Sequence, residues 1–476
     1  MHIASATPKK EASAPREVEF SYQPQDEVVM EPVSVKIPVI NKGLFRPETP
    51  NVKFGRSIKK PIPPLIRPNK EGNYVFDSQT QTKKFIAVNT MATVQHTFDE
   101  MKSIFGEGMT FVHDREKIAL FADKGEKMNA YYTRLFGGSL NFFHSTDPLS
   151  GDKFYTGSSG EVISHEVGHA ILDGQRPGFL LSFNADTQGF HEAFADSTAL
   201  FMSTQSDETC QLAVQQCGGD LRQDNCLANC AEQFGKVING RMEANITGGD
   251  YLRTFRHDYK WQDPSTVPAQ KDADHPLTTE MHDWSQIFTG AQYDILTDIT
   301  ARNIEGGMDP AQAIKAAGRE SMEILAGAVK ASPERDATYR DMALCMLKYD
   351  AEHNEGRNQD IILNNMIKRN ILQEGDKAPD DAAMQAMNNS EDVTITLSGP
   401  EYGMFSGAEV TGSSRHGAPA LLKDLKNLIK NGSILYTEPN QSVTKSDLFD
   451  RNGNAYVGVV RWVDGKMTIE QTGIIS

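Results

Sequence analysis

Hydrophobic spacing predicts a helical body that begins near residue 85. Apolar side chains recur every three or four positions from Phe85 to Phe105, the interval that places them on one face of a helix. Short β-like stretches follow at 109–121 and 139–143, and a glycine-rich turn at 157–160 leads into the next apolar run. The same periodicity predicts further helices at about 190–204, 208–236, 284–302, 309–331 and 335–351.

The two ends of the chain differ from this body. Residues 1–72 hold 11 of the 22 prolines, so we expect an extended or disordered arm that acts as a propeptide, tether or targeting segment. The main domain is expected at 73–373, followed by a polar linker at 374–392. Residues 393–476 are expected to form a small accessory domain, β-rich or α+β, with a hairpin turn at 450–454. Its predicted elements are strands at 393–397, 434–436 and 455–462 and a helix at 419–430. The fold class expected for the chain is α+β.

Charge and hydropathy exclude several classes of protein. The chain has 476 residues, enough for two or three folded units, and a net charge of −16. The arm alone is basic, with 12 Lys and Arg against 8 Asp and Glu, so no long basic surface for a phosphate backbone and no nucleic-acid partner are expected. No apolar run is long enough to span a membrane, and the N-terminus lacks the apolar core of a signal peptide.

Four of the five cysteines fall within 21 residues: Cys210, Cys217, Cys226 and Cys230. Disulfides such as 210 with 230 and 217 with 226 would close a helical hairpin, although the spacing does not fix the connectivity. Free thiols and a second metal site are the alternatives. Because disulfides form outside a reducing cytosol, we expect a secreted protein exported by a route that the N-terminus does not identify, with a cytoplasmic location as the alternative.

The most informative motif is His165-Glu166-Val167-Gly168-His169. Positions four apart on a helix share a face, so His165 and His169 can offer two imidazole nitrogens to one Zn²⁺, with Glu166 beside it. The blander interpretation is two surface histidines with a solvated glutamate. The longer pattern with a third histidine at position 175 is excluded, because that residue is Gln175.

A third ligand is expected from a second helix. Glu192 lies in the stretch 190–196, and Asp196 follows it by one turn on the same face, where a carboxylate can orient a ligating histidine. The joint occurrence of the two motifs favours a metal site over chance. Three protein ligands leave a fourth position open for water, which predicts a catalytic site with Glu166 as the general base.

Over roughly residues 85–373 the chain resembles the thermolysin-like zinc metallopeptidases of the gluzincin group. The resemblance is carried by four blocks, at 165–173, 189–196, 252–254 and 282–293. It implies a catalytic domain with a mixed-sheet lobe and a helical lobe, zinc as the cofactor, and hydrolysis of peptide bonds. It also implies that His165, His169 and Glu192 bind the metal, with Asp196 and Asp173 as carboxylates behind the ligands.

The same resemblance implies three residues that act on the substrate. His282 corresponds to a histidine that stabilises the oxyanion, and Arg253 to an arginine that contacts a substrate carbonyl. Asn141 is taken to represent an edge-strand asparagine that binds the substrate backbone. The family pairs the histidine with a carboxylate, for which the candidates here are Glu280, Asp274 and Asp283.

Calcium is considered at two places. Glu161 lies one turn before His165, where the family often has a calcium carboxylate, but Ser203 replaces the acidic partner expected one helix later. A glutamate at a helix start is also stabilised by the helix macrodipole without any ion. The oxygen-rich stretch 447–454 resembles a calcium loop, and an ordinary hairpin turn explains it better.

These observations predict a zinc-dependent endopeptidase that acts on protein or peptide substrates. The alternative is a toxin-like cargo or a non-catalytic zincin scaffold, whose N-terminal arm or C-terminal domain docks a partner or a secretion apparatus. The intact Glu166 favours the enzyme, because that residue is needed for chemistry and not for binding the metal.

Overall fold

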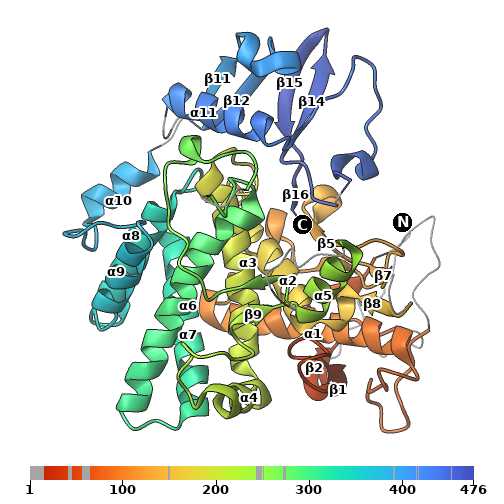
Figure 1. Cartoon of the computed structure of the whole chain (residues 1–476). Coiled ribbons are helices and arrows are strands. Elements are labelled where there is room, and N and C mark those ends of the chain that lie inside the picture. Colours follow the sequence, from red (N-terminus) through yellow and green to blue (C-terminus); the bar gives the residue numbers. More distant parts are fainter. Residues whose placement is uncertain are drawn as a thin grey trace, which may run out of the picture.

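The structure is a computed structural model. It describes residues 15–40, 46–55, 65–147, 151–242, 249, 251–271, 275–389, 392–413, 415, 417–451 and 453–475. The described chain has a mixed α+β architecture. A helical body and a sheet carry a separate module, formed by the blue C-terminal part of the chain in Figure 1.

The helical body is built around one central helix. Helix α3 packs against α2, α6 and α7. The helices of this body are α1 (Thr82–Phe105), α2 (Gly160–Gln175), α3 (Ala185–Gln205), α6 (Met281–Glu305), α7 (Pro310–Ala331), α8 (Tyr339–His353) and α9 (Gln359–Lys368). The approach of α2 to α3 requires a glycine, because a Cβ atom at Gly168 would lie 2.8 Å from the Cα atom of Ala195. The two helices that carry the sequence motifs therefore lie against each other.

The predicted helix at 208–236 is wrong in extent. The chain forms α4 (Asp207–Cys217), turns at Gly218 with φ of +65°, and re-enters helix only at α5 (Glu232–Met242). Strand β9 (Asn229–Cys230) lies between these two helices and pairs with β10 (Arg253–Thr254), which follows α5. Glycine adopts this left-handed conformation without strain. Gly218 therefore ends α4, although periodicity alone predicted one long helix.

A five-stranded sheet, in the order β16-β5-β6-β4-β3, flanks the helical body. Its strands are β3 (Val52–Phe54), β4 (Ile118–Phe121), β5 (Ala130–Thr133), β6 (Ser139–Phe142) and β16 (Ile474–Ile475). Strands β3, β4 and β6 run parallel, whereas β5 is antiparallel to both of its neighbours. A short hairpin of β7 (His144–Thr146) and β8 (Lys153–Tyr155) follows before α2. The mixed sheet thus draws on both ends of the described chain.

The expectation of an extended or disordered arm at 1–72 is wrong for the part that the structure describes. Strands β1 (Arg16–Tyr22) and β2 (Val33–Val39) form an antiparallel hairpin that packs on α1. Alternate residues of β1 are buried, including Val18 and Phe20. Pro38 occupies a strand with no second neighbour, where its missing N–H group costs no ladder bond. Residues 1–14, 41–45 and 56–64 lie outside the described residues.

The accessory domain, which we call the module, has its own core and a five-stranded sheet in the order β11-β12-β15-β14-β13. Its elements are β11 (Asp392–Thr396), β12 (Glu409–Ser413), α11 (Gly417–Lys430), β13 (Ile434–Leu435), β14 (Gly458–Val463) and β15 (Lys466–Gln471). The expected linker at 374–392 contains one further helix, α10 (Asp381–Asn388). The module is α+β, one of the two predicted alternatives.

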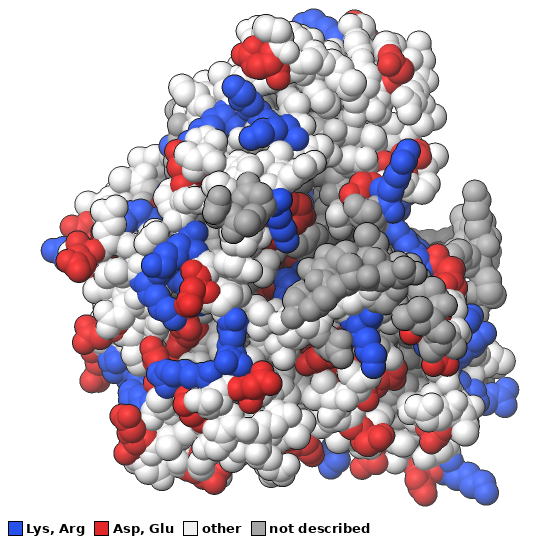
Figure 2. Space-filling view, in the orientation of Figure 1, with Lys and Arg blue, Asp and Glu red and all other residues white. Residues whose placement is uncertain are grey.

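Short 3-10 helices complete the described chain: η1 (Val112–Asp114), η2 (Leu135–Gly137), η3 (Thr156–Ser158), η4 (Pro264–Thr266), η5 (Pro400–Phe405) and η6 (Lys445–Leu448). None of the described helices combines the length and the apolar character that a membrane crossing needs. On the face shown in Figure 2, basic and acidic side chains both occur over the body and the module.

All five cysteines are free in the structure, and the predicted disulfides are not formed. Cys210 and Cys217 both lie on α4, where their thiols donate to the carbonyl oxygens of Thr204 and Ala213 at 3.1 Å and 3.0 Å. Cys230 lies on β9. The stretch is therefore not the single hairpin of two helices that this pairing would have closed.

Three carboxyl groups meet where the N-terminal segment joins the body: Asp26, Glu161 and Glu232. Burial raises the pKa of Asp26 from 3.8 to about 6 and that of Glu232 from 4.5 to about 7, and it holds the pKa of Glu161 well above its usual range. Glu161 and Glu232 share a hydrogen bond, so one of them keeps its proton. The cluster links the segment between β1 and β2 to α2 and α5, and it does so best when it is protonated.

We predict that this cluster makes stability depend on pH. Carboxyl groups with raised folded-state pKa values stabilise the fold below about pH 4, and that contribution is lost as the pH rises to about 7. Glu232→Gln should therefore exceed the wild type in stability by about 1 kcal/mol at pH 8 and match it at pH 4. Thermal unfolding at both pH values measures the difference, and an equal difference at the two values would contradict the prediction.

Candidate metal centre

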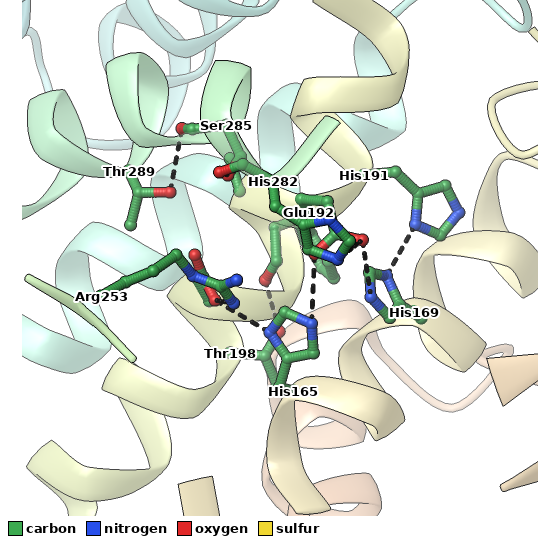
Figure 3. Close-up of polar contacts among 12 residues, drawn as sticks. His165, His169, His191, Glu192, Thr198, Arg253, His282, Ser285 and Thr289 are labelled. Carbon is green, nitrogen blue, oxygen red and sulfur yellow. Dashed lines mark hydrogen bonds and ion pairs between the residues drawn. The ribbon is translucent and has the colours of Figure 1, made fainter. Parts of the chain in front are cut away.

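Two capped helices position the motif residues. The side chain of Ser159 accepts from the backbone N–H of Val162 at the start of α2, and Asn184 accepts from Thr187 at the start of α3. His165 and His169 lie one turn apart on α2, and Glu192 lies on the facing side of α3. Figure 3 shows the Glu192 carboxylate between the two imidazole rings.

The three side chains form a compact buried group. Nε2 of His165 lies 3.3 Å from Oε2 of Glu192, and Nε2 of His169 lies 3.4 Å from Oε1. The ligand atoms all lie within 4.8 Å of one another. Over the described chain, this is the group of three His, Cys, Asp or Glu side chains whose geometry suits one metal ion. The expectation that His165, His169 and Glu192 come together is confirmed.

Unsatisfied buried atoms also point to a cation. Nε2 of His169 and both carboxylate oxygens of Glu192 are buried and have no hydrogen-bond partner. Such atoms cost free energy unless something replaces their lost hydration. A metal ion placed between the two rings and the carboxylate would satisfy them all, so the residues present fit a bound metal.

Each histidine is held from behind. Nδ1 of His165 lies 2.9 Å from Oδ1 of Asp196, and the same oxygen accepts from Nη2 of Arg253 at 2.7 Å. Nδ1 of His169 contacts Nδ1 of His191 at 2.9 Å. Burial lowers the pKa of His191 to about 3, so its ring is neutral and one of the two nitrogens donates to the other. These contacts turn both Nε2 atoms toward Glu192.

Asp173 does not have the role that the resemblance implied. Its carboxylate accepts from the hydroxyl of Tyr132 at 2.7 Å and forms an ion pair with Arg134, both on or next to β5. It therefore anchors the sheet to α2 instead of supporting a metal ligand. His191 takes the position behind His169, and the signal in the sequence is a histidine directly beside Glu192 on the same helix.

Glu166 faces a cleft beside this group. The cleft has a volume of about 700 Å³ and is lined by His165, Glu166, Arg253 and His282 together with residues of β5, α5 and the module. Burial raises the pKa of Glu166 to about 8, although the backbone N–H of Tyr132 donates to its carboxylate. Its Oε2 atom is buried and has no hydrogen-bond partner. The carboxylate of Glu166 therefore lies at the cleft, beside the metal-ligand group.

The carboxylate partner of His282 is Glu280. Oε1 of Glu280 lies 2.6 Å from Nδ1 of His282, while Nε2 of the same ring lies 3.5 Å from Oε1 of Glu192. Burial alone would lower the pKa of His282, but the charges of Glu192 and Glu280 outweigh it and raise the pKa to about 10. Asp283 instead pairs with Lys271 at 2.6 Å, and Asp274 lies outside the described residues.

The assignment of Asn141 as a substrate-binding edge residue is wrong. Asn141 lies on β6, an internal strand, and its fully buried side chain donates to Tyr131 and Ser139 within the sheet. The cleft is bordered instead by Asn129 and Ala130, at the start of β5. The pairing order of the strands decides which asparagine lies at the edge, and local sequence does not show that order.

The residues considered for calcium do not form a metal group. Glu161 accepts from the backbone N–H of Ala231 at 3.1 Å, and among the described residues it belongs to no group of metal-ligand geometry. The stretch 447–454 closes through a backbone bond from Asp450 N to the carbonyl oxygen of Asn454, with Asn454 N also donating to Asp450. A hairpin turn therefore accounts for it, as the simpler interpretation held.

Removing the support behind His165 should weaken the site without destroying it. Asp196→Ala is expected to lower the affinity for zinc, or the activity, by about 10- to 100-fold, because outer carboxylates fix the orientation and basicity of a ligating imidazole. Isothermal titration of metal-free protein with zinc measures this. Asp220→Ala, a change at an exposed residue after the end of α4, is the control, and an equal affinity in both variants would contradict the role of Asp196.

Comparisons with protein-family models and with curated proteins find no match for this chain. The chemistry of the site rests on its side chains and their geometry. The buried pair of histidines, the carboxylate between them and the adjacent Glu166 are the features that carry it.

Proposed function

We propose that the protein is a zinc-dependent peptidase of the thermolysin-like type, which hydrolyses internal peptide bonds. The single observation that supports this most is the buried group of His165, His169 and Glu192 with Glu166 facing the same cleft. Two imidazole nitrogens and one carboxylate oxygen form the donor set of catalytic zinc sites that keep one position open. When bound, zinc supplies a Lewis acid that polarises a carbonyl and acidifies water.

Residues of the protein supply proton transfer, stabilisation of the oxyanion and binding of the substrate. Glu166 takes the proton of the attacking water on its unpartnered Oε2 and returns it to the leaving amine. Nε2 of His282 points toward Glu192 and donates to the oxygen that becomes negative in the transition state, and Glu280 holds the ring in place. Arg253, which borders the cleft from β10, donates to a substrate carbonyl.

Removal of the metal tests the proposal. We expect one zinc ion per chain, and a chelator should reduce hydrolysis of a short apolar peptide at least about 100-fold, since the metal contributes several kcal/mol to the transition state. Zinc should restore the activity. The metal should also raise the unfolding temperature, because it binds the folded state alone. Stable hydrolysis in metal-free protein would overturn the proposal.

A further inference from the structure

The edge of β5 beside the cleft is already occupied. Strand β16 pairs antiparallel with it, with Ile474 opposite Thr133 and Ile475 opposite Tyr132. The contact continues at Gly473, whose carbonyl oxygen accepts from the backbone N–H of Arg134 at 3.2 Å. A peptide that added to this edge as a strand would therefore meet the protein's own chain at Tyr132.

The other end of the same edge is covered as well. The side-chain Nδ2 of Asn129 donates to the carbonyl oxygen of Gly453 at 2.8 Å. Gly453 belongs to the hairpin turn of the module, and Arg451 and Asn454 of that turn also line the cleft. Two residues of β5, Ala130 and Tyr131, lie between the contacts made at Asn129 and at Tyr132. The described residues leave at most these two positions of the edge uncovered.

The two segments that cover the edge of β5, strand β16 and the hairpin turn of the module, are both packed into the core on the sheet side of the cleft. Ile474 and Ile475 are 3% and 2% exposed, and Ile475 belongs to the main core cluster of the body. Phe449, just before the hairpin turn, packs on Tyr131 with ring centroids 4.9 Å apart. Because β16 is buried and the ring of Phe449 is packed, both are fixed parts of the fold. We call β16, Phe449 and the hairpin turn, which together cover the edge of β5, the wall.

The module also holds the opposite side of the cleft. Asn431 donates to the hydroxyl of Thr279 at 2.6 Å, next to the Glu280 that supports His282, and Lys423 pairs with Asp263 at 2.6 Å. Figure 1 shows the module lying over the body while β16 descends to β5. The module thus bridges the sheet and the helices on either side of the metal centre.

We propose that this wall restricts the enzyme to short peptides. The inference rests on the proposed function and names its substrate class: oligopeptides with few residues on each side of the cleaved bond. The cleft of about 700 Å³ has the size of small-ligand pockets, about 300–1,000 Å³, and not of a groove that a long chain crosses. The reaction is plain hydrolysis: the water oxygen bonds the carbonyl carbon, the C–N bond breaks, and the amine leaves with a proton.

A nested series of peptides tests the restriction in the wild-type protein loaded with zinc. Peptides of about 5, 10, 20 and 40 residues, spanning up to roughly 130 Å when extended, share one central cleavage sequence. We expect kcat/KM to fall at least tenfold between the shortest and the longest, and casein to remain intact. Equal kcat/KM values across the series overturn the restriction alone. A failure to cleave any peptide overturns the proposed function and the restriction with it.

A variant that loosens the wall gives the second measurement. Ile475→Gly removes the buried side chain that anchors β16, and Val463→Gly removes an exposed one from β14 as the matched control. The ratio of kcat/KM for the longest and shortest peptides should rise at least fivefold in I475G and stay constant in V463G. This ratio does not depend on the fraction of folded enzyme. An unchanged ratio in I475G overturns the assignment of β16 as the wall.

Discussion

Replacing Glu166 with Gln is expected to reduce kcat on a short peptide by about 10²- to 10⁴-fold while zinc binding stays unchanged. Glu166 is not part of the His165, His169 and Glu192 group, so the amide variant keeps all three ligands. An amide cannot take the proton that the buried Oε2 atom is placed to accept. The loss should therefore appear in the chemical step and not in the metal content.

The measurement combines steady-state kinetics with zinc quantified in the same preparations. Glu161→Gln is the matched control, because it changes a buried carboxylate on the same helix one turn away and outside the cleft lining. Retained hydrolysis in E166Q would show that another group is the base. Zinc bound by a wild-type protein that cleaves no peptide would favour the cargo or scaffold alternative.

The second large effect is expected at Asp186, in the first turn of α3. Its buried carboxylate accepts from the indole N–H groups of Trp284 at 2.8 Å and Trp261 at 3.0 Å, and from the backbone N–H of Tyr339 at 3.2 Å. Asp186→Ala leaves these donors without an acceptor, which we expect to cost roughly 3 kcal/mol or more of unfolding free energy. The residue thus fixes the start of the helix that carries Glu192.

Denaturant unfolding of the zinc-loaded protein measures this cost. Asp207→Ala provides the comparison, because Asp207 also lies in the first turn of a helix but is largely exposed and pairs with Lys315 on the surface. Its loss should cost at most about 1 kcal/mol. A similar small value for D186A would mean that water or a rearranged side chain replaces the carboxylate.

The metal group was accessible from sequence because its information is local. His165 and His169 are separated by one helical turn, and the pair Glu192 and Asp196 repeats that spacing, so periodicity alone predicts which face each side chain occupies. What periodicity cannot supply is the approach of α2 to α3, which depends on packing at Gly168. The joint occurrence of the two motifs is what predicted that α2 and α3 lie side by side.

Features that depend on pairing between distant segments were missed. Asn129 borders the cleft because β5 lies outside β6, and nothing in its neighbourhood distinguishes it from Asn141. The proline content of residues 1–72 predicts an arm, whereas the alternation of Val18 and Phe20 is what accompanies the observed strand pairing. Glu280 was one of three candidates, and the short distance to His282 decides among them.

The pairing of β16 with β5 also sets an order of assembly. Thr133 and Gly473, which are hydrogen-bonded, lie 340 positions apart, so a chain emerging from the ribosome completes α2 and α3 long before the sheet can close. Until then β5 presents an unpaired edge, a common site of aggregation. Contacts of such long range are formed slowly, because a large loop must close first. We therefore expect the sheet beside the cleft to close only late in folding, so that the proposed restriction to short substrates would be acquired after the metal group has formed.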